Sequence, residues 1–166
     1  NRHTVEIDSR RVHSTQPSFE LVRRIRASYY LLGALLGRFG EATVAMPGGC
    51  DFGVRPIDQH IKGFTAMGAE VSVESGYINA KAKNGHLRGA NIYLDVVSVG
   101  ATMNIMMAAA LAEGTSLITE SVWNNRFKYV DELKRLGARI QVDGKVAVLE
   151  GVDHFTGAPV QAPDLR

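Results

Sequence analysis

The chain has 166 residues, 45% of them hydrophobic, and a formal net charge of +2 at pH 7, which fits one large globular domain or two small ones. Because the basic residues are scattered and the longest apolar stretch, residues 105–112, is too short to span a bilayer, we expect neither a nucleic-acid surface nor a membrane segment. The single cysteine cannot form an internal disulfide, which favours a cytoplasmic protein, and no common zinc or nucleotide-binding motif occurs.

Alternating helix and strand patterns run along the chain from residue 27. The first half predicts helices at 27–38 and 57–67 and strands at 42–46, 69–73, 77–82 and 88–94. The second half predicts helices at 100–113 and 127–136 and strands at 116–120, 138–142, 145–149 and 158–163. Before residue 27 the chain offers only the segment Thr4–Ile7, which we interpret as the tail of a unit, and a link through Pro17.

The two halves repeat each other. Gly68 and Gly137, 69 positions apart, each separate a helix pattern from a strand pattern, and Gly89 and Gly157 match at a spacing of 68 positions. Glycine after a helix supplies the left-handed cap that ends it. The sequence therefore predicts an α/β (α+β) fold of repeated units whose helices pack against sheets, and we expect both ends to be cut from a longer array.

The only cysteine, Cys50, lies on a glycine-rich segment five residues before Arg55. Glycines free the backbone, the guanidinium group of Arg55 can stabilise a thiolate or hold an anion, and Pro56 suits the first turn of the helix that follows. A lone cysteine is usually an inert core residue. Here the turn-forming and charged neighbours favour a reactive, partly exposed thiol.

Two further positions are candidates for holding anions. Ser98, Val99 and Gly100 open a predicted helix whose backbone N–H groups could bind a diphosphate, although an ordinary Ser N-cap explains Ser98 equally well. Arg26, like Arg55, is a candidate for phosphate or carboxylate contacts, and a solvated surface arginine or a salt bridge explains Arg26 equally well. The methionines at 103, 106 and 107 indicate core packing.

These residues resemble the motifs of the UDP-N-acetylglucosamine 1-carboxyvinyltransferases, a family of enolpyruvyl transferases. In order along the chain, the matching segments are Arg26–Ser28, Pro47–Cys50, Gly53–His60, Leu94–Thr102, Ala112–Thr115, Asn125–Phe127 and Asp164–Arg166. The sister enzymes that use shikimate phosphate share the fold and chemistry but, as a family, lack the cysteine loop, which disfavours them here.

The resemblance implies an inside-out α/β barrel of βαβαββ-type units with mixed sheets. It implies transfer of enolpyruvyl from phosphoenolpyruvate to the 3-hydroxyl of UDP-N-acetylglucosamine with release of phosphate, the first committed step of peptidoglycan synthesis. The family's reaction uses no metal or organic cofactor, and its partners are these two small-molecule substrates.

The resemblance also implies roles for single residues. Cys50 would be the general acid and the thiol alkylated by the antibiotic fosfomycin, Asp58 would accept a hydrogen bond from uracil, and His60 would lie against the nucleotide, although a lone helical histidine is more often structural. The implied substrate-binding residues are Arg26, Arg55, Pro56, Ile57, Asp58, Gln59, His60, Ser98, Val99, Gly100, Arg126, Asp164 and Arg166.

The resemblance divides the chain near residue 114. Residues 1–114 resemble part of the family's cysteine-loop (UDP-sugar) domain, and residues 115–166 resemble one repeat unit from part of its second, catalytic domain. A long intervening stretch is absent, and exchange between repeats, a designed chimera or omitted residues would each explain the seam. The family's lysine-asparagine motif, general-base aspartate and late arginine have no counterpart, which leaves open a second hypothesis, a non-catalytic UDP-sugar-binding or interaction module. The sequence does not determine the oligomeric state.

Overall fold

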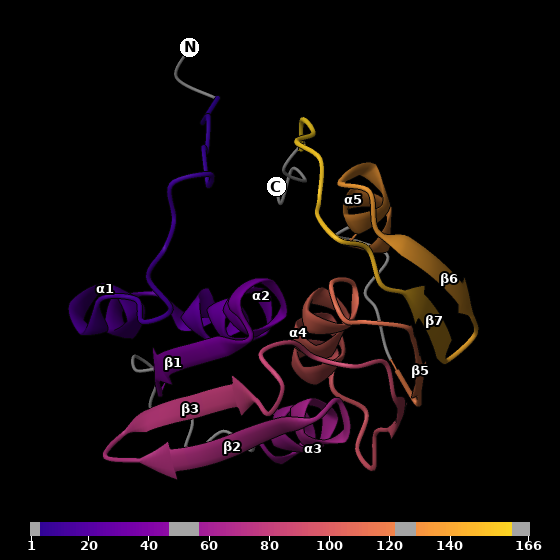
Figure 1. Cartoon of the computed structure of the whole chain (residues 1–166), viewed down its shortest axis with the longest axis horizontal. Coiled ribbons are helices and arrows are strands. Elements are labelled where there is room, and N and C mark those ends of the chain that lie inside the picture. The colour runs from indigo at the N-terminus through magenta and orange to yellow at the C-terminus, as the bar shows by residue number, and fades with distance from the viewer. Residues whose placement is uncertain (1–3, 47–56, 122–128, 161–166) are drawn as a thin grey trace, which may run out of the picture.

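Two β-sheets lie on the outside of the molecule and their covering helices lie between them (Figure 1). This computed structural model describes residues 4–46, 57–121 and 129–160. The described chain begins with α1 (Phe19–Arg24) and a 3₁₀ turn (Arg26–Tyr29). None of the described helices is long and apolar enough to cross a membrane.

The first sheet contains β1 (Glu41–Ala45), β2 (Ala69–Glu74) and β3 (Tyr77–Ala82) in the order β1-β3-β2, with both pairs antiparallel. Its inner face carries small and branched apolar residues, which are almost fully buried: Ala42, Val44, Ala69, Ile78 and Ala80. Helices α2 (Tyr30–Phe39) and α3 (Asp58–Ala66) pack on this face. Small side chains on the strands let both helices lie close to the sheet.

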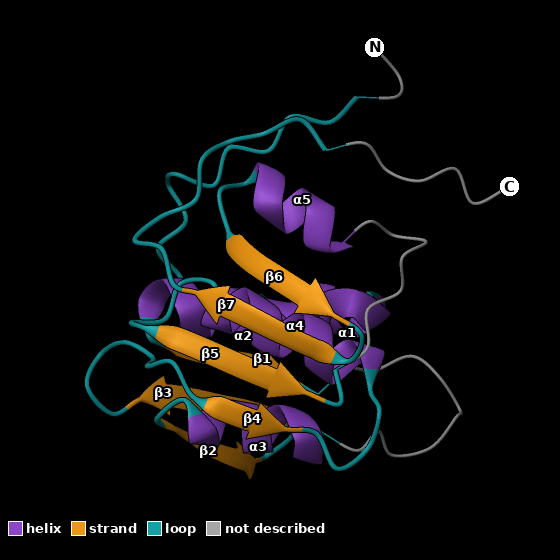
Figure 2. Cartoon of the chain, turned by 90° about the vertical axis from the view of Figure 1, so that its right-hand side faces the viewer, coloured by secondary structure: helices purple, strands orange, loops and turns teal. Residues whose placement is uncertain are grey.

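The second sheet contains β4 (Asn91–Tyr93), β5 (Thr115–Thr119), β6 (Arg139–Asp143) and β7 (Val146–Glu150) in the order β4-β5-β7-β6 (Figure 2). The β4–β5 pair is parallel, and the other two pairs are antiparallel. Helices α4 (Val99–Ala109) and α5 (Tyr129–Arg135) contact its strands. The predicted α/β architecture of helices packed against sheets is therefore confirmed, and of the two described sheets only the second is mixed.

The internal repeat extends to single backbone hydrogen bonds. The N–H group of Leu117, the third residue of β5, donates to the Ala90 carbonyl oxygen at 2.9 Å. The N–H group of Thr43, the third residue of β1, donates to the Thr15 carbonyl oxygen at the same distance. The link before α1 thus lies beside β1, and the segment that enters β4 lies beside β5 in the corresponding position.

Several expected boundaries were wrong, because strands form only where a neighbour pairs with them. The segment expected as strand 88–94 is ordered as a strand only at Asn91–Tyr93, and it pairs with β5 of the second sheet. Residues 158–160 of the expected strand 158–163 form no strand, and the remainder lies outside the described residues. The side chains of Val5 and Ile7 are each 84% exposed, and α1 was not predicted.

The helix bounds also differ from the sequence predictions. The segment expected as one helix at 27–38 is a 3₁₀ turn followed by α2, which ends at the left-handed Gly40. The helix expected at 100–113 begins at Val99 and ends at Ala109. Of the helix expected at 127–136, residues 127 and 128 lie outside the described residues, and α5 ends at Arg135.

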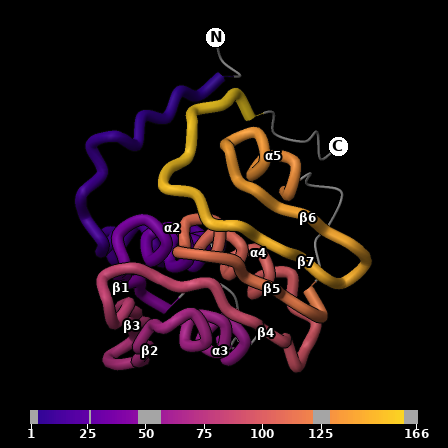
Figure 3. Tube along the Cα trace, turned by 45° about the vertical axis from the view of Figure 1, so that its right-hand side comes forward, coloured from indigo at the N-terminus to yellow at the C-terminus, as the bar shows by residue number. Residues whose placement is uncertain are grey.

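Helix α4 lies at the centre of the fold (Figure 3). Its residues Ala101, Ile105, Met106 and Ala108 have no exposed surface. The helix is therefore buried on several sides and does not have one apolar and one polar face. Its neighbours are α2, α3 and the second sheet. From α5, the Tyr129 hydroxyl donates to the Met103 carbonyl oxygen at 2.8 Å, and burial raises the pKa of Tyr129.

Glycines on α2 permit its close approach to α4. A Cβ atom at Gly33 would collide with the backbone oxygen and the side-chain Oδ1 of Asn104, and one at Gly37 would lie 3.0 Å from the Ala108 Cα. Both glycines belong to α2, where alanine would otherwise favour the helix. Helix packing, not helix propensity, therefore determines these two positions.

We expect Gly33→Ala to lower the free energy of unfolding by about 1–3 kcal/mol, because overpacking outweighs the gain in helix propensity of about 1 kcal/mol. Gly37→Ala, with its nearest atom at 3.0 Å, should lower it less. Urea unfolding followed by circular dichroism measures both. A gain in stability for Gly33→Ala would contradict the close α2–α4 contact.

Candidate functional site

The predicted site residues divide into those that the structure describes and those outside its described ranges. The described ones are Ile57, Asp58, Gln59, His60, Ser98, Val99 and Gly100. Arg26 lies in the 3₁₀ turn, but its side chain is outside the description. Also outside the described residues are Cys50, Arg55, Pro56, Arg126, Asp164 and Arg166, so their predicted roles remain predictions.

The described site residues gather at the beginnings of two helices. Ile57 is the N-cap of α3, and Asp58 is its first residue. Ser98 is the N-cap of α4, where its Oγ accepts the Ala101 N–H at 3.2 Å. The capping role proposed as the ordinary explanation of Ser98 is therefore realised, and it leaves the N–H groups of Val99 and Gly100 at the positive end of the helix.

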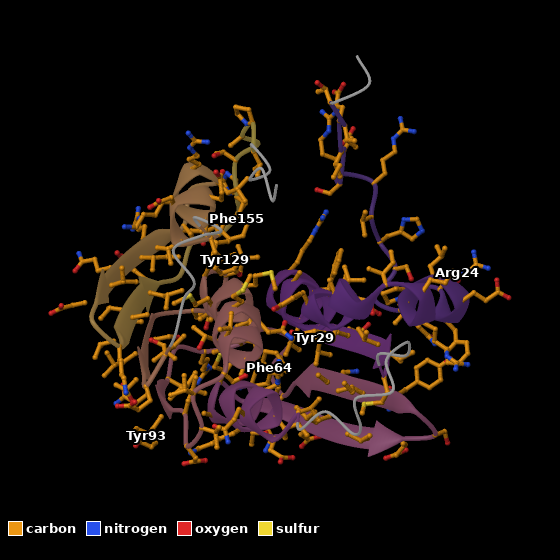
Figure 4. All side chains as sticks on the ribbon, turned by 180° about the vertical axis from the view of Figure 1, so that it is seen from behind. Arg24, Tyr29, Phe64, Tyr93, Tyr129 and Phe155 are labelled. Carbon is orange, nitrogen blue, oxygen red and sulfur yellow. The ribbon has the colours of Figure 1, made fainter. Side chains whose placement is uncertain are left out.

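The two helix beginnings meet at Tyr29. The Tyr29 ring lies edge-on to the His60 ring, with centroids 5.5 Å apart and an interplanar angle of 80°. The Tyr29 hydroxyl lies 2.6 Å from the place where a Cβ of Gly100 would stand. Figure 4 shows Tyr29 among the side chains that fill the space between the helices. A residue of the Arg26 turn thus contacts both helix beginnings.

His60 lies in this junction as a buried, neutral histidine. Its side chain is only 6% exposed, and neither ring nitrogen has a hydrogen-bond partner among the described residues. Burial lowers the pKa of His60 to about 4, and the nearby backbone of Gly100 only partly offsets this effect. These observations favour the structural explanation of His60 over direct contact with a solvated nucleotide.

Gln59 and Lys62 hold the loop that precedes α4. The Asp95 N–H donates to Gln59 Oε1 at 2.9 Å, and the Lys62 ammonium donates to Asp95 Oδ1 at 2.6 Å. The hydrogen bonds from Lys62 and then from Gln59 lower the pKa of the exposed Asp95 carboxyl. The Lys62 ammonium also lies 5.6 Å from the centre of the Tyr93 ring. The side chain of Gln59 is thus engaged within the fold.

Sequence reasoning missed Lys62, Asp95 and Tyr29 as parts of this site. Lys62 lies three residues after Gln59 on one face of α3, so helical spacing could have indicated the pair. Tyr29 follows the Arg26–Ser28 motif directly but carries no pattern of its own. Asp95 becomes a partner only through the approach of α3 to the loop after β4.

The arrangement suits an anion with an extended polar body. The beginnings of α3 and α4, helices of 9 and 11 residues, are adjacent and present the positive ends of their dipoles together. Asp58 is exposed at the same edge and can accept hydrogen bonds. Within the described residues no group of three His, Cys, Asp or Glu side chains could hold a metal ion.

A hollow of about 780 Å³ lies elsewhere, beside the C-terminal ends of α2 and α4. It is lined by Arg10, Arg38, Glu113, Asp153 and Phe155, among others. The negative ends of helix dipoles disfavour an anion there. The adjacent helix beginnings are therefore the better candidate site for an anionic ligand.

Comparisons with known proteins place the chain among enolpyruvyl transferases. Residues 1–124 match the family described as EPSP synthase (3-phosphoshikimate 1-carboxyvinyltransferase). The UDP-N-acetylglucosamine 1-carboxyvinyltransferase 3 of Caldanaerobacter subterraneus is 32% identical over 305 residues, covering 99% of this chain and 73% of that protein. The UDP-N-acetylglucosamine 1-carboxyvinyltransferase 1 of Halalkalibacterium halodurans is 49% identical over 146 residues, covering 87% of this chain.

The solved structures show the same fold. The enolpyruvyl transferase NikO from Streptomyces tendae matches with a TM-score of 0.67 and 22% identity over 84% of this chain. The chain spans 33% of NikO and 33% of the Halalkalibacterium relative. The alignment with the Caldanaerobacter relative runs over 305 positions although the chain has 166 residues, so that relative carries a long stretch without a counterpart here.

Burial of neutral His60 predicts a specific dependence of stability on pH. Between the unfolded pKa of 6.5 and the folded pKa of about 4, only the unfolded chain binds this proton. Stability should therefore fall as the pH falls through that window, with a contribution from His60 of about 3 kcal/mol in total. His60→Phe, which keeps an aromatic ring against Tyr29, should lack this contribution.

Urea unfolding of both proteins at pH 7, 5.5 and 4 measures the difference. Equal pH slopes for the two proteins would show that His60 is solvated or hydrogen-bonded in the folded state.

Proposed function

This chain belongs to the enolpyruvyl transferase family, and on that premise we propose that it carries the site of a UDP-N-acetylglucosamine 1-carboxyvinyltransferase. The proposed reaction transfers enolpyruvyl from phosphoenolpyruvate to the 3-hydroxyl of UDP-N-acetylglucosamine. It would take place in the cytoplasm as the first committed step of peptidoglycan synthesis and so serve cell-wall formation, cell shape and division. The relatives that support this choice carry that activity in their names.

One observation carries the proposal: the motif ending at His60 and the motif ending at Gly100, forty positions apart in the sequence, come together at the Tyr29 ring. The two segments are too far apart in sequence to be neighbours along the chain, so only the fold brings them together. A ligand that needs an acceptor from one motif and backbone N–H donors from the other would bind across this junction. A nucleotide diphosphate sugar has both requirements, with uracil on the Asp58 side and the diphosphate at the beginning of α4.

The proposed chemistry is addition followed by elimination. The sugar hydroxyl would give its proton to water as its oxygen bonds to C2 of phosphoenolpyruvate, and the Cys50 thiol would give a proton to C3, which forms a tetrahedral intermediate. Return of a proton from C3 to the Cys50 thiolate and loss of phosphate from C2 would then restore the double bond. Such a sequence needs a positioned acid and concentrated positive charge. We assign the acid to Cys50 and the charge to Arg55 and Arg26.

The residues assigned from the second half complete the proposal. Arg126, Asp164 and Arg166 would contact the sugar or the enolpyruvyl group from the other side. The alignment with the Caldanaerobacter relative runs over 305 positions and so contains a long gap, which we assign to the neighbourhood of residue 114. Residues 1–114 would then bind the UDP-sugar, and residues 115–166 would derive from a repeat of the catalytic domain.

Reaction of Cys50 with fosfomycin tests the proposed acid. In the presence of UDP-N-acetylglucosamine, we expect one covalent adduct by intact-mass spectrometry, because the deprotonated fraction of a reactive Cys50 thiol would open the epoxide. Release of phosphate from phosphoenolpyruvate, measured in parallel, tests turnover. Cys50→Ala is the matched control and should show neither adduct nor release.

The two readouts separate the hypotheses. An adduct with phosphate release supports the transferase, and an adduct without release supports the UDP-sugar-binding module. Absence of both from the wild-type protein would refute the assignment of Cys50.

Gly100→Ala tests the proposed diphosphate site. The added methyl group would lie 2.6 Å from the Tyr29 hydroxyl and push the ring from the junction. We expect the dissociation constant for UDP-N-acetylglucosamine, measured by calorimetry, to rise at least about tenfold, equivalent to about 1.4 kcal/mol. The control is Gly157→Ala, where no atom lies within 4 Å of the new Cβ and affinity should be unchanged. Unchanged affinity in Gly100→Ala would remove the beginning of α4 from the binding site.

A further inference from the structure

Asn104 lies on the central helix α4 and is fully buried. Its Oδ1 accepts the Gly33 N–H at 2.7 Å, and its Nδ2 donates to the Tyr29 carbonyl oxygen at 3.0 Å. Tyr29 and Gly33 are four residues apart, so their carbonyl and N–H groups are the pair that a continuous α-helix joins directly. The Asn104 amide therefore bridges the junction where the Arg26–Tyr29 turn passes into α2.

The helix core does not require an amide at this position. Asparagine is a poorer helix former than its alanine and methionine neighbours, and burying an amide is unfavourable unless its polar groups are paired. Here both ends of the amide are paired with backbone groups of another helix. Gly33 supplies the space, because a Cβ there would collide with Asn104. Gly33 and Asn104 together therefore make these two hydrogen bonds possible.

The bridge acts on the turn that carries the proposed anion-binding Arg26. Asn104 holds the backbone of Tyr29 at the end of that turn, and the Tyr29 ring contacts His60 of α3 and abuts Gly100 of α4. Displacing the Tyr29 backbone would therefore move the turn relative to both helix beginnings.

We infer that Asn104 is a positioning residue for the substrate site: its amide fixes the Arg26–Tyr29 turn against the beginnings of α3 and α4, so that groups from all three elements meet one anionic ligand. The inference rests on the proposed function for the identity of that ligand, a nucleotide diphosphate sugar. Its structural part, the locking of the turn, is independent of any ligand. Asn104 itself touches no reacting atom in this assignment.

The test compares Asn104→Leu with Met106→Ala. Leucine has the same branched side-chain skeleton as asparagine, with bulkier methyl groups, and removes both hydrogen bonds. Asn104→Ser is a smaller variant whose hydroxyl is too short to join both backbone groups. Met106 is also fully buried on α4, and two residues further along a helix it points to the opposite side. Met106→Ala therefore destabilises the core without touching the bridge, and it controls for a general loss of stability.

Hydrogen exchange and ligand binding are measured at a temperature where all variants are folded. In Asn104→Leu and Asn104→Ser we expect amide exchange in residues 26–33 to rise at least about tenfold, because a bridge of two buried hydrogen bonds is lost locally. We expect the dissociation constant for UDP-N-acetylglucosamine to rise by at least about tenfold as well. Met106→Ala should not raise amide exchange in residues 26–33 more than elsewhere in the protein, and it should leave the dissociation constant unchanged.

The outcomes are distinguishable from failure of the proposed function. If the wild-type protein does not bind UDP-N-acetylglucosamine, the ligand assignment fails. Faster amide exchange confined to residues 26–33 in the Asn104 variants would still support the bridge. Wild-type exchange in both Asn104 variants would overturn the inference. Equal loosening of residues 26–33 in Met106→Ala would also overturn it, since Asn104 would then contribute only general stability.

Discussion

The close contact between α2 and α4 is the constraint on which the rest of the structure depends. It requires two glycines on one helix, Gly33 and Gly37, and small or amide side chains at the facing positions Asn104 and Ala108. Because backbones at this distance leave no room for adjustment, the relative positions of the two helices are fixed to within small shifts. Each sheet then packs on helices that are already held together, and the first sheet and second sheet share one core.

That contact also determines where the candidate site can form. The turn before α2 and the beginning of α4 lie at the same end of the helix pair, and α3 packs on α4 so that His60 comes beside Gly100. The turn before α2 and the beginnings of α3 and α4 therefore meet at one junction. Among the described side chains Lys62 is already paired with Asp95, so the positive character of the described part of the junction comes from helix dipoles, to which the proposed function adds Arg26 and Arg55.

Local sequence predicted the elements better than it predicted their partners. Glycine caps such as Gly40 and the alternation of apolar residues located most helices and strands, because these signals act within one turn or one strand. The pairing of β4 with β5 and the absence of strands at residues 4–7 and 158–160 depend on neighbours distant in sequence. The same reason explains why Ser98 was anticipated as a cap, whereas Tyr29 and Asn104 were not found: the hydrogen bond between them spans 75 positions.

The turn near residue 114 joins the two segments that the proposed function assigns to different repeats, and strands from both sides of it share one sheet. Strand β4 precedes the turn and β5 to β7 follow it, yet Ile92, Ile118 and Ala147 face the same core. The turn is held from both sides, because the Gly89 N–H donates to the Glu113 carbonyl oxygen and the Gly151 N–H donates to that of Gly114. Both hydrogen bonds join backbone groups, so they do not depend on the side chains of the segments that meet here. An exchange at this turn therefore preserves the hydrogen bonds and the inward-facing pattern, and the packing of α4 against the sheet requires only that the exchanged strands keep their alternation.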